Sequence, residues 1–293
     1  MLKLRPLLLR ALLVTTFVMH AAVAQQKPLL TKLAKEAAAA SLVVGHRGAS
    51  EKCPENTLAA FREAVANGAQ IVEFDVYQTK DGAWVVMHDD TCDRTTDAVA
   101  HFGRKKVRVD ELTLAQIREL DAGKWRGEEF AGEHVPTLAE TLEAIFPACP
   151  MIERKGGDAK ALAEELRRLK VLDRVIVQAF DWEWLTKFRA EESHCVLGAL
   201  GGKDLTADRL KEIQGTGADF VHWDHKTLRV EDAQAIRQKG YLLCVYTVDL
   251  DMAFVGAAAM GCDFITTNRP ARLVELRRNG ALRRPAQPSP AGK

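Results

Sequence analysis

The sequence predicts an α/β fold, a (β/α)8 TIM-type barrel, on the basis of two observations. Between residues 42 and 278, eight short runs rich in Val, Ile and Leu alternate with eight amphipathic segments. This alternation is typical of a closed parallel sheet surrounded by helices. In addition, ionisable residues stand at the ends of several apolar runs, and the carboxyl ends of barrel strands are where functional residues gather.

Each apolar run has the length of one strand, and several amphipathic segments begin with a capping residue. The expected strands are 42–46, 71–76, 150–155, 174–180, 194–200, 218–223, 241–247 and 263–267. The expected helices lie near 57–67, 137–145, 158–170, 181–192, 206–214, 231–239, 249–260 and 270–278. Thr137-x-x-Glu140 has the pattern of a capping box, and Gly68 follows the first helix as expected of a C-terminal cap.

Residues 84–88 form a ninth apolar run that does not fit this alternation. The turn Lys80-Asp81-Gly82 before it is too short for a crossover helix, so we expect the run to return antiparallel as a β-hairpin after the second strand. A tight turn would place His88 opposite Asp75.

Residues 1–24 have the features of a secretory signal peptide. Three basic residues precede an apolar run from Ala11 to Met19, and Ala22-Val23-Ala24 has the small residues of a cleavage site. A run of nine residues is too short to span a bilayer. We therefore expect cleavage after Ala24 and a periplasmic or secreted protein. A buried or membrane-anchoring helix is the alternative that stays open.

The rest of the chain is expected to form one domain with short flanking segments. These are an N-terminal lead-in at 25–40, a catalytic barrel domain at 41–280 with a small insertion at about 91–136, and a disordered tail at 281–293. The insertion is rich in charge and turn residues and contains one expected short helix, 113–120. An insertion on the catalytic face could shape a substrate pocket.

Charge and cysteine content exclude some classes of partner and fold. Loss of residues 1–24 would lower the formal net charge from +1 to −2. A nearly neutral body without basic stripes argues against nucleic acid as a partner, and no later apolar run predicts a stable membrane anchor. The six cysteines permit disulfides in an exported chain, but the sequence gives neither their pairing nor the oligomeric state.

The charged residues at the strand ends are the candidate functional residues. They are His46, Arg47, Glu73, Asp75, His88, Glu153 and Lys155. Buried charge is costly unless it is paired or metal-bound, so their repeated placement after apolar runs predicts one polar site above the packed sheet. Two imidazoles, three carboxylates, an arginine and a lysine are suited to metal-assisted phosphoryl chemistry.

With these motifs the chain resembles the glycerophosphodiester phosphodiesterase family. The resemblance rests on nine motifs in order, His46-Arg47-Gly48, Pro54-Glu55-Asn56-Thr57, Glu73-x-Asp75, Thr79-x-Asp81-Gly82, His88-Asp89, Arg94-x-Thr96, Pro136-Thr137-Leu138, Glu153-x-Lys155 and Tyr246-Thr247-Val248. It covers the chain from about residue 42 to Pro270, and the family's phospholipase-C-like barrel with a small insertion agrees with the fold expected from the alternation.

The resemblance implies a role for each candidate residue. Glu73, Asp75 and Glu153 match the family's metal ligands, and His46 and His88 match its acid–base pair. Arg47 and Lys155 match residues that hold the phosphate. An all-oxygen ligand set suits one divalent cation, Ca²⁺ or Mg²⁺. The sequence favours His46 as base and His88 as acid but does not settle their order.

The implied activity is that of an exported, metal-dependent phosphoric diester hydrolase. It would convert deacylated phospholipid head groups, which are small-molecule glycerophosphodiesters, to glycerol 3-phosphate and an alcohol, through a cyclic phosphate. The alternatives are a lysophospholipase D or sphingomyelinase D-like lipid phosphodiesterase, which needs an exposed apolar entrance, and a non-catalytic binding protein on the same barrel.

Several of the residues also have structural interpretations. Lys155 could be a rim ion-pair partner of Glu153, and Arg47 could brace a loop. Asn56 could cap the first helix or reach the site, and we favour the cap. The run His222-Trp223-Asp224-His225 contains two histidines, but we favour Trp223 or His222 as a pocket-lining residue over a second metal site.

Two positions depart from the family pattern. Tyr246 replaces the usual Trp before Thr-Val, and Asp249 replaces the usual Asn. A tyrosine at the pocket wall would change the leaving-group preference rather than the reaction.

Overall fold

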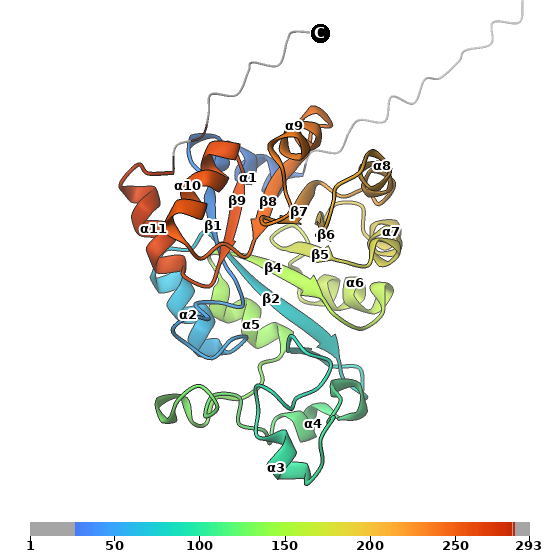
Figure 1. The fold of residues 1–293 in the computed structure, drawn as a ribbon. Helices are drawn as coiled ribbons and strands as arrows, with labels where there is room; N and C mark the ends of the chain where they lie inside the picture. The colour runs from blue at the N-terminus through green and yellow to red at the C-terminus, as the bar shows by residue number, and fades with distance from the viewer. Residues whose placement is uncertain (1–26, 283, 285–293) are drawn as a thin grey trace, which may run out of the picture.

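A closed barrel of eight parallel strands forms the centre of the molecule, which confirms the predicted (β/α)8 architecture (Figure 1). The structure, a computed structural model, describes residues 27–282 and residue 284. The barrel strands are β1 (Leu42–Gly45), β2 (Ile71–Gln78), β4 (Cys149–Arg154), β5 (Ile176–Ala179), β6 (Val196–Gly201), β7 (Phe220–Asp224), β8 (Leu242–Tyr246) and β9 (Phe264–Thr267). They pair in the order β1-β9-β8-β7-β6-β5-β4-β2, and β1 closes the barrel on β2.

A helix follows each barrel strand, as expected. These helices are α2 (Leu58–Ala66), α5 (Leu138–Ile145), α6 (Ala159–Arg168), α7 (Trp182–Glu191), α8 (Ala207–Gly215), α9 (Val230–Gln238), α10 (Asp251–Met260) and α11 (Pro270–Arg278). The capping box Thr137-x-x-Glu140 is present at the start of α5, where the Thr137 hydroxyl accepts from the Glu140 backbone N–H.

The barrel interior has an apolar lower part and a polar upper part. Inward-facing Val44, Ile71, Met151 and Phe220 belong to one apolar cluster with residues of α1 (Pro28–Ala39). Above this cluster the inward positions become polar, for example Glu73 two residues after Ile71, since side chains on the same face recur every second residue. Within the barrel interior, the inward-facing charged residues thus lie toward the carboxyl ends of the strands.

Helix α1 lies within the segment that the sequence analysis described only as a lead-in. Its Leu33 and Ala37 are buried in the same apolar cluster as the lower strand residues. Lys27, just before the helix, donates to both carboxylate oxygens of Asp219 at 2.7 Å. The lead-in therefore closes one end of the barrel.

The additional strand β3 (Trp84–Val86) pairs antiparallel with β2, which confirms the predicted hairpin. Its register differs by one residue from the prediction. Gln78 pairs with Trp84, so Met87 rather than His88 lies opposite Asp75, and the Met87 N–H donates to the Asp75 carbonyl oxygen. The difference arises at the turn, where Thr79 faces Ala83 rather than Trp84. The Thr79 N–H donates to the Ala83 carbonyl oxygen at 2.8 Å, and the Thr79 hydroxyl accepts from the Ala83 N–H at 3.0 Å.

The segment after β3 forms a small separate layer at one side of the barrel (Figure 1). It contains α3 (Ala98–Phe102), α4 (Leu114–Ile117) and two short 3₁₀ helices, Val109–Glu111 and Glu128–Phe130. Val85 of the hairpin packs into its apolar core. The hairpin thereby ties the segment to the strand that carries Glu73 and Asp75.

Both ends of the chain bear on earlier predictions. The predicted signal peptide lies outside the described residues. Two residues of the segment predicted as a disordered tail, 281–293, make contacts with the domain. Leu282 is buried, and Arg284 pairs with Asp263 at 2.8 Å. All six cysteines have free thiols. Among the described residues, no helix combines the length and apolarity that crossing a membrane requires.

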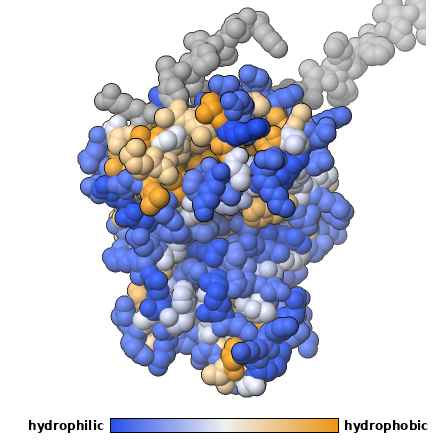
Figure 2. Space-filling view, in the orientation of Figure 1, coloured by the Kyte–Doolittle hydropathy of each residue, from blue (hydrophilic) through white to orange (hydrophobic). Residues whose placement is uncertain are grey.

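The surface is mostly hydrophilic, with hydrophobic side chains gathered at the end of the molecule near α10 (Figure 2). Leu250 and Met252, at the start of α10, are 71% and 82% exposed. They follow Asp249, which lines a cavity beside His46. Apolar surface therefore adjoins one edge of the candidate site.

Candidate active site

Three buried carboxylates lie together at the carboxyl ends of two neighbouring strands. Glu73 and Asp75 stand on the inner face of β2, and Asp75 pairs in register with Glu153 of β4. One ligand oxygen from each lies within 4.8 Å of the others. Their exposures are only 1%, 1% and 7%. The structure thus brings together all three predicted metal ligands.

The environment of the three carboxylates opposes their simultaneous ionisation. Burial, followed by the charge of Asp75, raises the pKa of Glu73 well above its usual value and raises the pKa of Glu153 to about 7. Glu73 Oε1 is buried and has no hydrogen-bond partner. An orphaned oxygen within a set of hard carboxylate ligands fits a divalent cation such as Ca²⁺ or Mg²⁺.

Two basic side chains flank the carboxylates. Lys155 Nζ lies 2.6 Å from Glu153 and 3.6 Å from Asp75. The Arg47 backbone N–H donates to Glu73 at 2.9 Å, and its guanidinium pairs with Glu55 at 2.8 Å. Arg47 Nε lies 3.4 Å from Asp75 without the geometry of a hydrogen bond. Both cationic side chains therefore border the carboxylate site, and the buried Nε of Arg47 has no hydrogen-bond partner.

The backbone that presents Arg47 requires a glycine. Gly48 has φ +86°, and a Cβ at this position would lie 2.6 Å from the carbonyl carbon of Ala60 on α2. A side chain cannot occupy that space, so the loop after β1 can pack on α2 only with glycine at position 48. This close approach explains the third residue of the His46-Arg47-Gly48 motif.

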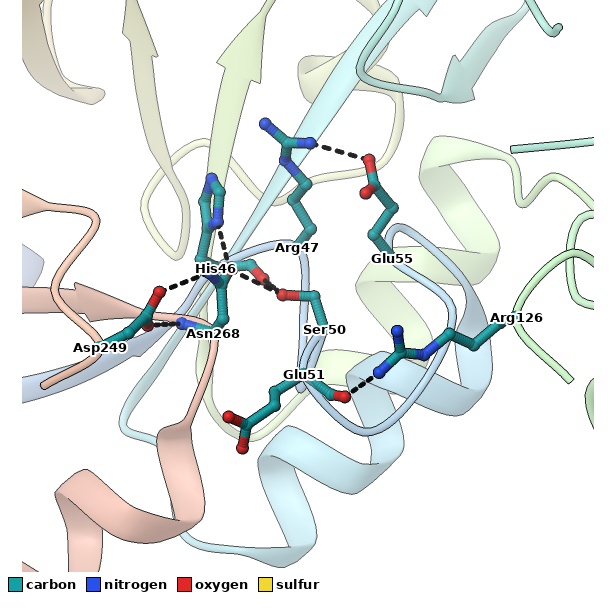
Figure 3. A pocket seen from close by; sticks show the side chains of 8 residues that line it. All are labelled: His46, Arg47, Ser50, Glu51, Glu55, Arg126, Asp249 and Asn268. Carbon is teal, nitrogen blue, oxygen red and sulfur yellow. Dashed lines mark hydrogen bonds and ion pairs between the residues drawn. The ribbon is translucent and has the colours of Figure 1, made fainter. Parts of the chain in front are cut away.

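His46 has a fixed partner for one of its ring nitrogens. Its Nδ1 lies 2.7 Å from Asn268 Oδ1, and the Asn268 amide is held in turn by Asp249 (Figure 3). Burial, and next the charge of Arg47, lowers the pKa of His46 to about 4. The imidazole is therefore neutral at physiological pH and available as a proton acceptor.

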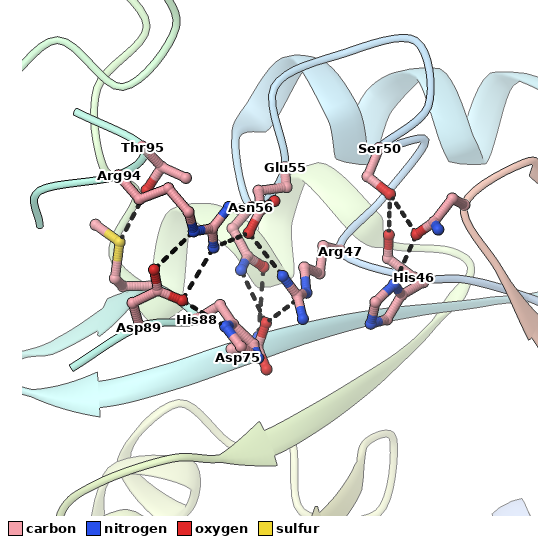
Figure 4. A network of polar contacts seen from close by, with 12 residues as sticks. His46, Arg47, Ser50, Glu55, Asn56, Asp75, His88, Asp89, Arg94 and Thr95 are labelled. Carbon is pink, nitrogen blue, oxygen red and sulfur yellow. Dashed lines mark hydrogen bonds and ion pairs between the residues drawn. The ribbon is translucent and has the colours of Figure 1, made fainter. Parts of the chain in front are cut away.

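His88 has a charged partner instead. Its Nδ1 lies 2.6 Å from Asp89 Oδ1, and Arg94 donates to both oxygens of Asp89 at 2.7 and 3.0 Å (Figure 4). Hydrogen bonds from Arg94 are the main cause that lowers the pKa of Asp89. A carboxylate accepts hydrogen bonds, so Asp89 accepts from His88 Nδ1 and holds the ring in one orientation, with Nε2 left to exchange a proton.

Asn56 reaches the site, contrary to the prediction that it caps the first helix. Thr57 is the N-cap of α2 and accepts from the Ala60 N–H. Asn56 is buried, and its Nδ2 donates to Asp75 Oδ2 at 2.9 Å. It adopts φ +59°, which asparagine tolerates better than most residues. The side chain turns inward because the helix already has a cap.

A cavity of about 380 Å³ opens beside His46 and Arg47 (Figure 3). Its lining residues are His46, Arg47, Ser50, Glu51, Glu55, Arg126, Asp249 and Asn268. Arg126 comes from the segment predicted as an insertion and donates to the Glu51 carbonyl oxygen. That segment therefore contributes to the wall of the cavity.

Of the two predicted pocket-lining aromatics, the structure places only one at the mouth of the barrel. Tyr246 ends β8 on its inner face, and its ring meets the half-exposed Phe180 edge-on at 6.0 Å. Trp223 is fully buried in the layer between strands and helices, where its indole donates to the Lys203 carbonyl oxygen. The Trp223 prediction is wrong because side chains alternate along β7 and this position faces outward.

His222 occupies the inward position next to Trp223, but it lies below the site. Its two ring nitrogens contact Gln178 Oε1 at 2.7 Å and Thr266 Oγ1 at 3.0 Å. Burial lowers its pKa to about 3. Because both ring nitrogens already have hydrogen-bond partners, His222 is a core histidine and not a metal ligand, as favoured from the sequence.

Five residues around the site were not proposed as functional candidates from the sequence. They are Glu55, Asp89, Arg94, Asp249 and Asn268. The first three belong to motifs that carried the resemblance, and this membership was the available signal. Asn268 directly follows the last strand, so its position at a strand end could have identified it.

Comparison with known proteins identifies the relatives of this chain. Residues 46–272 match the model of the glycerophosphoryl diester phosphodiesterase family. The chain is 34% identical over 248 residues to a glycerophosphodiester phosphodiesterase of Caldanaerobacter subterraneus subsp. tengcongensis, an alignment that covers 82% of this chain and 99% of that protein. A glycerophosphodiester phosphodiesterase of Bacillus subtilis is also 34% identical, over 78% of this chain and 84% of the relative.

Solved structures show the same fold. The structure of a phosphodiesterase from Oleispira antarctica, in complex with its product sn-glycerol-3-phosphate, is similar with a TM-score of 0.74 at 24% identity, over 82% of this chain and 97% of that one. A glycerophosphodiester phosphodiesterase from Agrobacterium tumefaciens is similar with a TM-score of 0.69 at 28% identity, over 80% of this chain and 99% of that one.

Proposed function

This chain belongs to the glycerophosphoryl diester phosphodiesterase family, and we propose that it is an exported, metal-dependent enzyme that hydrolyses deacylated phospholipid head groups. The products would be glycerol 3-phosphate and an alcohol. The observation that carries this proposal is the cluster of Glu73, Asp75 and Glu153 between two cationic side chains and beside two differently partnered histidines.

Arg47 and Lys155 are suited to binding the phosphodiester. Each already pairs with a carboxylate, but Arg47 Nε has no hydrogen-bond partner, and Lys155 can turn its remaining donors to an oxygen ligand. Glu73, Asp75 and Glu153 would hold the divalent cation. When bound, that cation supplies positive charge that stabilises the non-bridging oxygens of the phosphate.

The partners of the two histidines support His46 as the base and His88 as the acid. Burial, and next the charge of Arg47, lowers the pKa of His46, so its imidazole stays unprotonated and can take the proton of the glycerol 2-hydroxyl. His88 donates its Nδ1–H to the Asp89 carboxylate, which orients Nε2 as the nitrogen that exchanges a proton with the substrate. His88 can then give a proton to the departing alcohol oxygen.

The proposed first step forms a bond between the 2-hydroxyl oxygen and phosphorus and breaks the bond to the head-group alcohol. It leaves a cyclic glycerol phosphate, a protonated His46 and a neutral His88. In the second step His88 takes a proton from water, and the water oxygen bonds to phosphorus. The bond between phosphorus and the 2-oxygen breaks, and His46 returns its proton to that oxygen. The two histidines thereby regain their starting states.

Turnover of glycerophosphocholine tests this proposal. We expect hydrolysis that stops on removal of divalent cations by a chelator and returns with Ca²⁺ or Mg²⁺, each added separately. A 2-deoxy analogue keeps the phosphate and the choline but lacks the attacking oxygen, so it should bind as a competitive inhibitor and remain intact.

Two results would contradict the proposal. Absence of glycerophosphocholine turnover with either cation would reject the substrate class, and hydrolysis of the 2-deoxy analogue at a comparable rate would reject the cyclic intermediate. Lysophosphatidylcholine, assayed in parallel, addresses the lipid-cleaving alternative, for which the exposed Leu250 and Met252 would supply an apolar entrance. We expect the soluble diester to be the better substrate, because the cavity beside His46 is lined by polar and charged residues.

Export is supported by the order of basic, apolar and small residues within 1–24. Lys27, the third residue after the proposed cleavage site, binds Asp219 and so anchors the start of the mature chain to the barrel. We expect intact-mass analysis of the secreted or periplasmic fraction to show Gln25 as the first residue. Ala24→Tyr should block cleavage. A soluble protein that retains Met1 would contradict export.

A further inference from the structure

His46, Asn268 and Asp249 form one continuous hydrogen-bonded chain beside the cavity (Figure 3). His46 Nδ1 lies 2.7 Å from Asn268 Oδ1, and Asn268 Nδ2 donates to Asp249 Oδ2 at 2.7 Å. Asp249 Oδ1 accepts from the Asn268 backbone N–H at 2.8 Å and from the Thr267 hydroxyl at 2.9 Å. Both oxygens of Asp249 are therefore committed to Thr267 and Asn268 at the end of β9.

The hydrogen bonds among these three residues determine which ring nitrogen of His46 carries the proton. An ionised carboxylate only accepts hydrogen bonds, so the side facing Asp249 must be the NH2 of Asn268 and the side facing His46 must be its carbonyl oxygen. A carbonyl oxygen requires a donor, so His46 carries its proton on Nδ1. Nε2 is then the nitrogen with the free lone pair.

We infer that Asp249 is a positioning residue that sets the tautomer of His46 through the orientation of the Asn268 amide. The inference rests on the proposed role of His46 as base, because only the Nδ1–H tautomer leaves Nε2 able to take a proton from the substrate. Asp249 does not touch the reacting atoms. It acts by fixing the orientation of the amide, since the Ser50 hydroxyl, 2.8 Å from Asn268 Oδ1 and from the His46 carbonyl oxygen, can accept from an amide NH2 or donate to an amide oxygen.

An asparagine at position 249, the residue usual in the resembling family pattern, would not give the same orientation in this network. Its carbonyl oxygen would stay with the two donors, Thr267 Oγ1 and the Asn268 N–H. Its NH2 would then face the Asn268 side chain and favour the reversed amide. The reversed amide presents NH2 to His46, which favours the Nε2–H tautomer and removes the base.

The test is Asp249→Asn in the full enzyme, with nitrogen NMR of the histidine side chains and steady-state kinetics. We expect the His46 signals to change from the Nδ1–H to the Nε2–H pattern. We expect kcat to fall by about tenfold or more with KM little changed, since the contribution of a general base is commonly about 10²–10⁴-fold. Asp251→Asn is the matched control, because Asp251 pairs with Arg272 at the start of α10.

Exchange of the two residues gives a second, charge-conserving test. In the double variant Asn268→Asp/Asp249→Asn, the new carboxylate at position 268 accepts from both His46 and the new amide at position 249. The Nδ1–H tautomer should therefore return and kcat should recover. The carboxylate now lies directly on His46, so the acidic limb of the kcat profile should move to higher pH by about one unit or more.

The other charged and titratable groups facing His46 are the same in wild type and in the exchanged variant. These are Arg47, Glu55, Asp75 and His222. An acidic limb that does not move, or kcat that recovers no further than in Asp249→Asn, would overturn the inference. An unchanged His46 tautomer in Asp249→Asn would do the same. Failure of the wild type to hydrolyse any glycerophosphodiester would instead reject the proposed function, since the NMR result does not depend on turnover.

Discussion

Glu73→Gln is expected to abolish both metal binding and activity. The amide keeps the shape of the side chain, but it replaces one of three anionic oxygens that lie within 4.8 Å of one another. Removal of a residue that only hydrogen-bonds to a metal ligand commonly weakens metal affinity by about 10–100-fold. Removal of a direct ligand should therefore weaken it by at least about 100-fold. Calorimetric titration with Ca²⁺ and Mg²⁺, beside glycerophosphocholine kinetics, measures both effects.

The same substitution should not destabilise the metal-free protein. Glu73 is buried beside Asp75 and Glu153, and its Oε1 makes no hydrogen bond, so its negative charge is unfavourable without a cation. We expect the metal-free variant to melt at the same temperature as the metal-free wild type or above it. Glu63→Gln, at a surface carboxylate on α2, is the control and should retain metal affinity. Wild-type affinity in Glu73→Gln would remove Glu73 from the ligand set.

Inward-facing strand positions were predictable from the sequence because the period of a strand is local. Glu73 and Asp75 differ by two positions and so share a face, and Ile71, two positions before Glu73, lies in the apolar cluster inside the barrel. Glu153 required a further step, the expectation that parallel strands bring their carboxyl ends together. The barrel itself followed from the same local patterns, since they recur eight times.

Features that depend on pairing between distant segments were not predictable in this way. The register of the hairpin depended on the two hydrogen bonds between Thr79 and Ala83, and an error of one residue there misplaced His88 relative to Asp75. Asn56 turned inward because Thr57 had already capped α2. Trp223 was assigned to the pocket by residue type, whereas the phase of β7 decides which face it occupies.

The two histidines should respond differently to a substrate whose leaving group needs no proton. Para-nitrophenolate is a far weaker base than the alkoxide of choline, so it departs without a general acid. We expect His88→Ala to lower glycerophosphocholine turnover by about 10²–10⁴-fold but to release nitrophenol from the para-nitrophenyl ester of glycerol phosphate within about tenfold of the wild-type rate. His46→Ala should lose activity on both substrates, because the attack of the 2-hydroxyl still requires a base.

The fate of the phosphate gives an independent reading of the same pair. If His88 also activates water in the second step, His88→Ala should release cyclic glycerol phosphate from the nitrophenyl ester instead of glycerol 3-phosphate, and phosphorus NMR distinguishes the two. If the nitrophenyl ester restored the activity of His46→Ala rather than that of His88→Ala, the roles of the two histidines would be exchanged. The hydrogen-bond partners support His46 as the base and His88 as the acid. Asp89, itself bound by Arg94, contacts His88 Nδ1, whereas a neutral amide contacts His46 Nδ1. Burial keeps the His46 imidazole neutral and so able to accept a proton, whereas the hydrogen bond to Asp89 holds the His88 ring in place for proton transfer to the leaving oxygen.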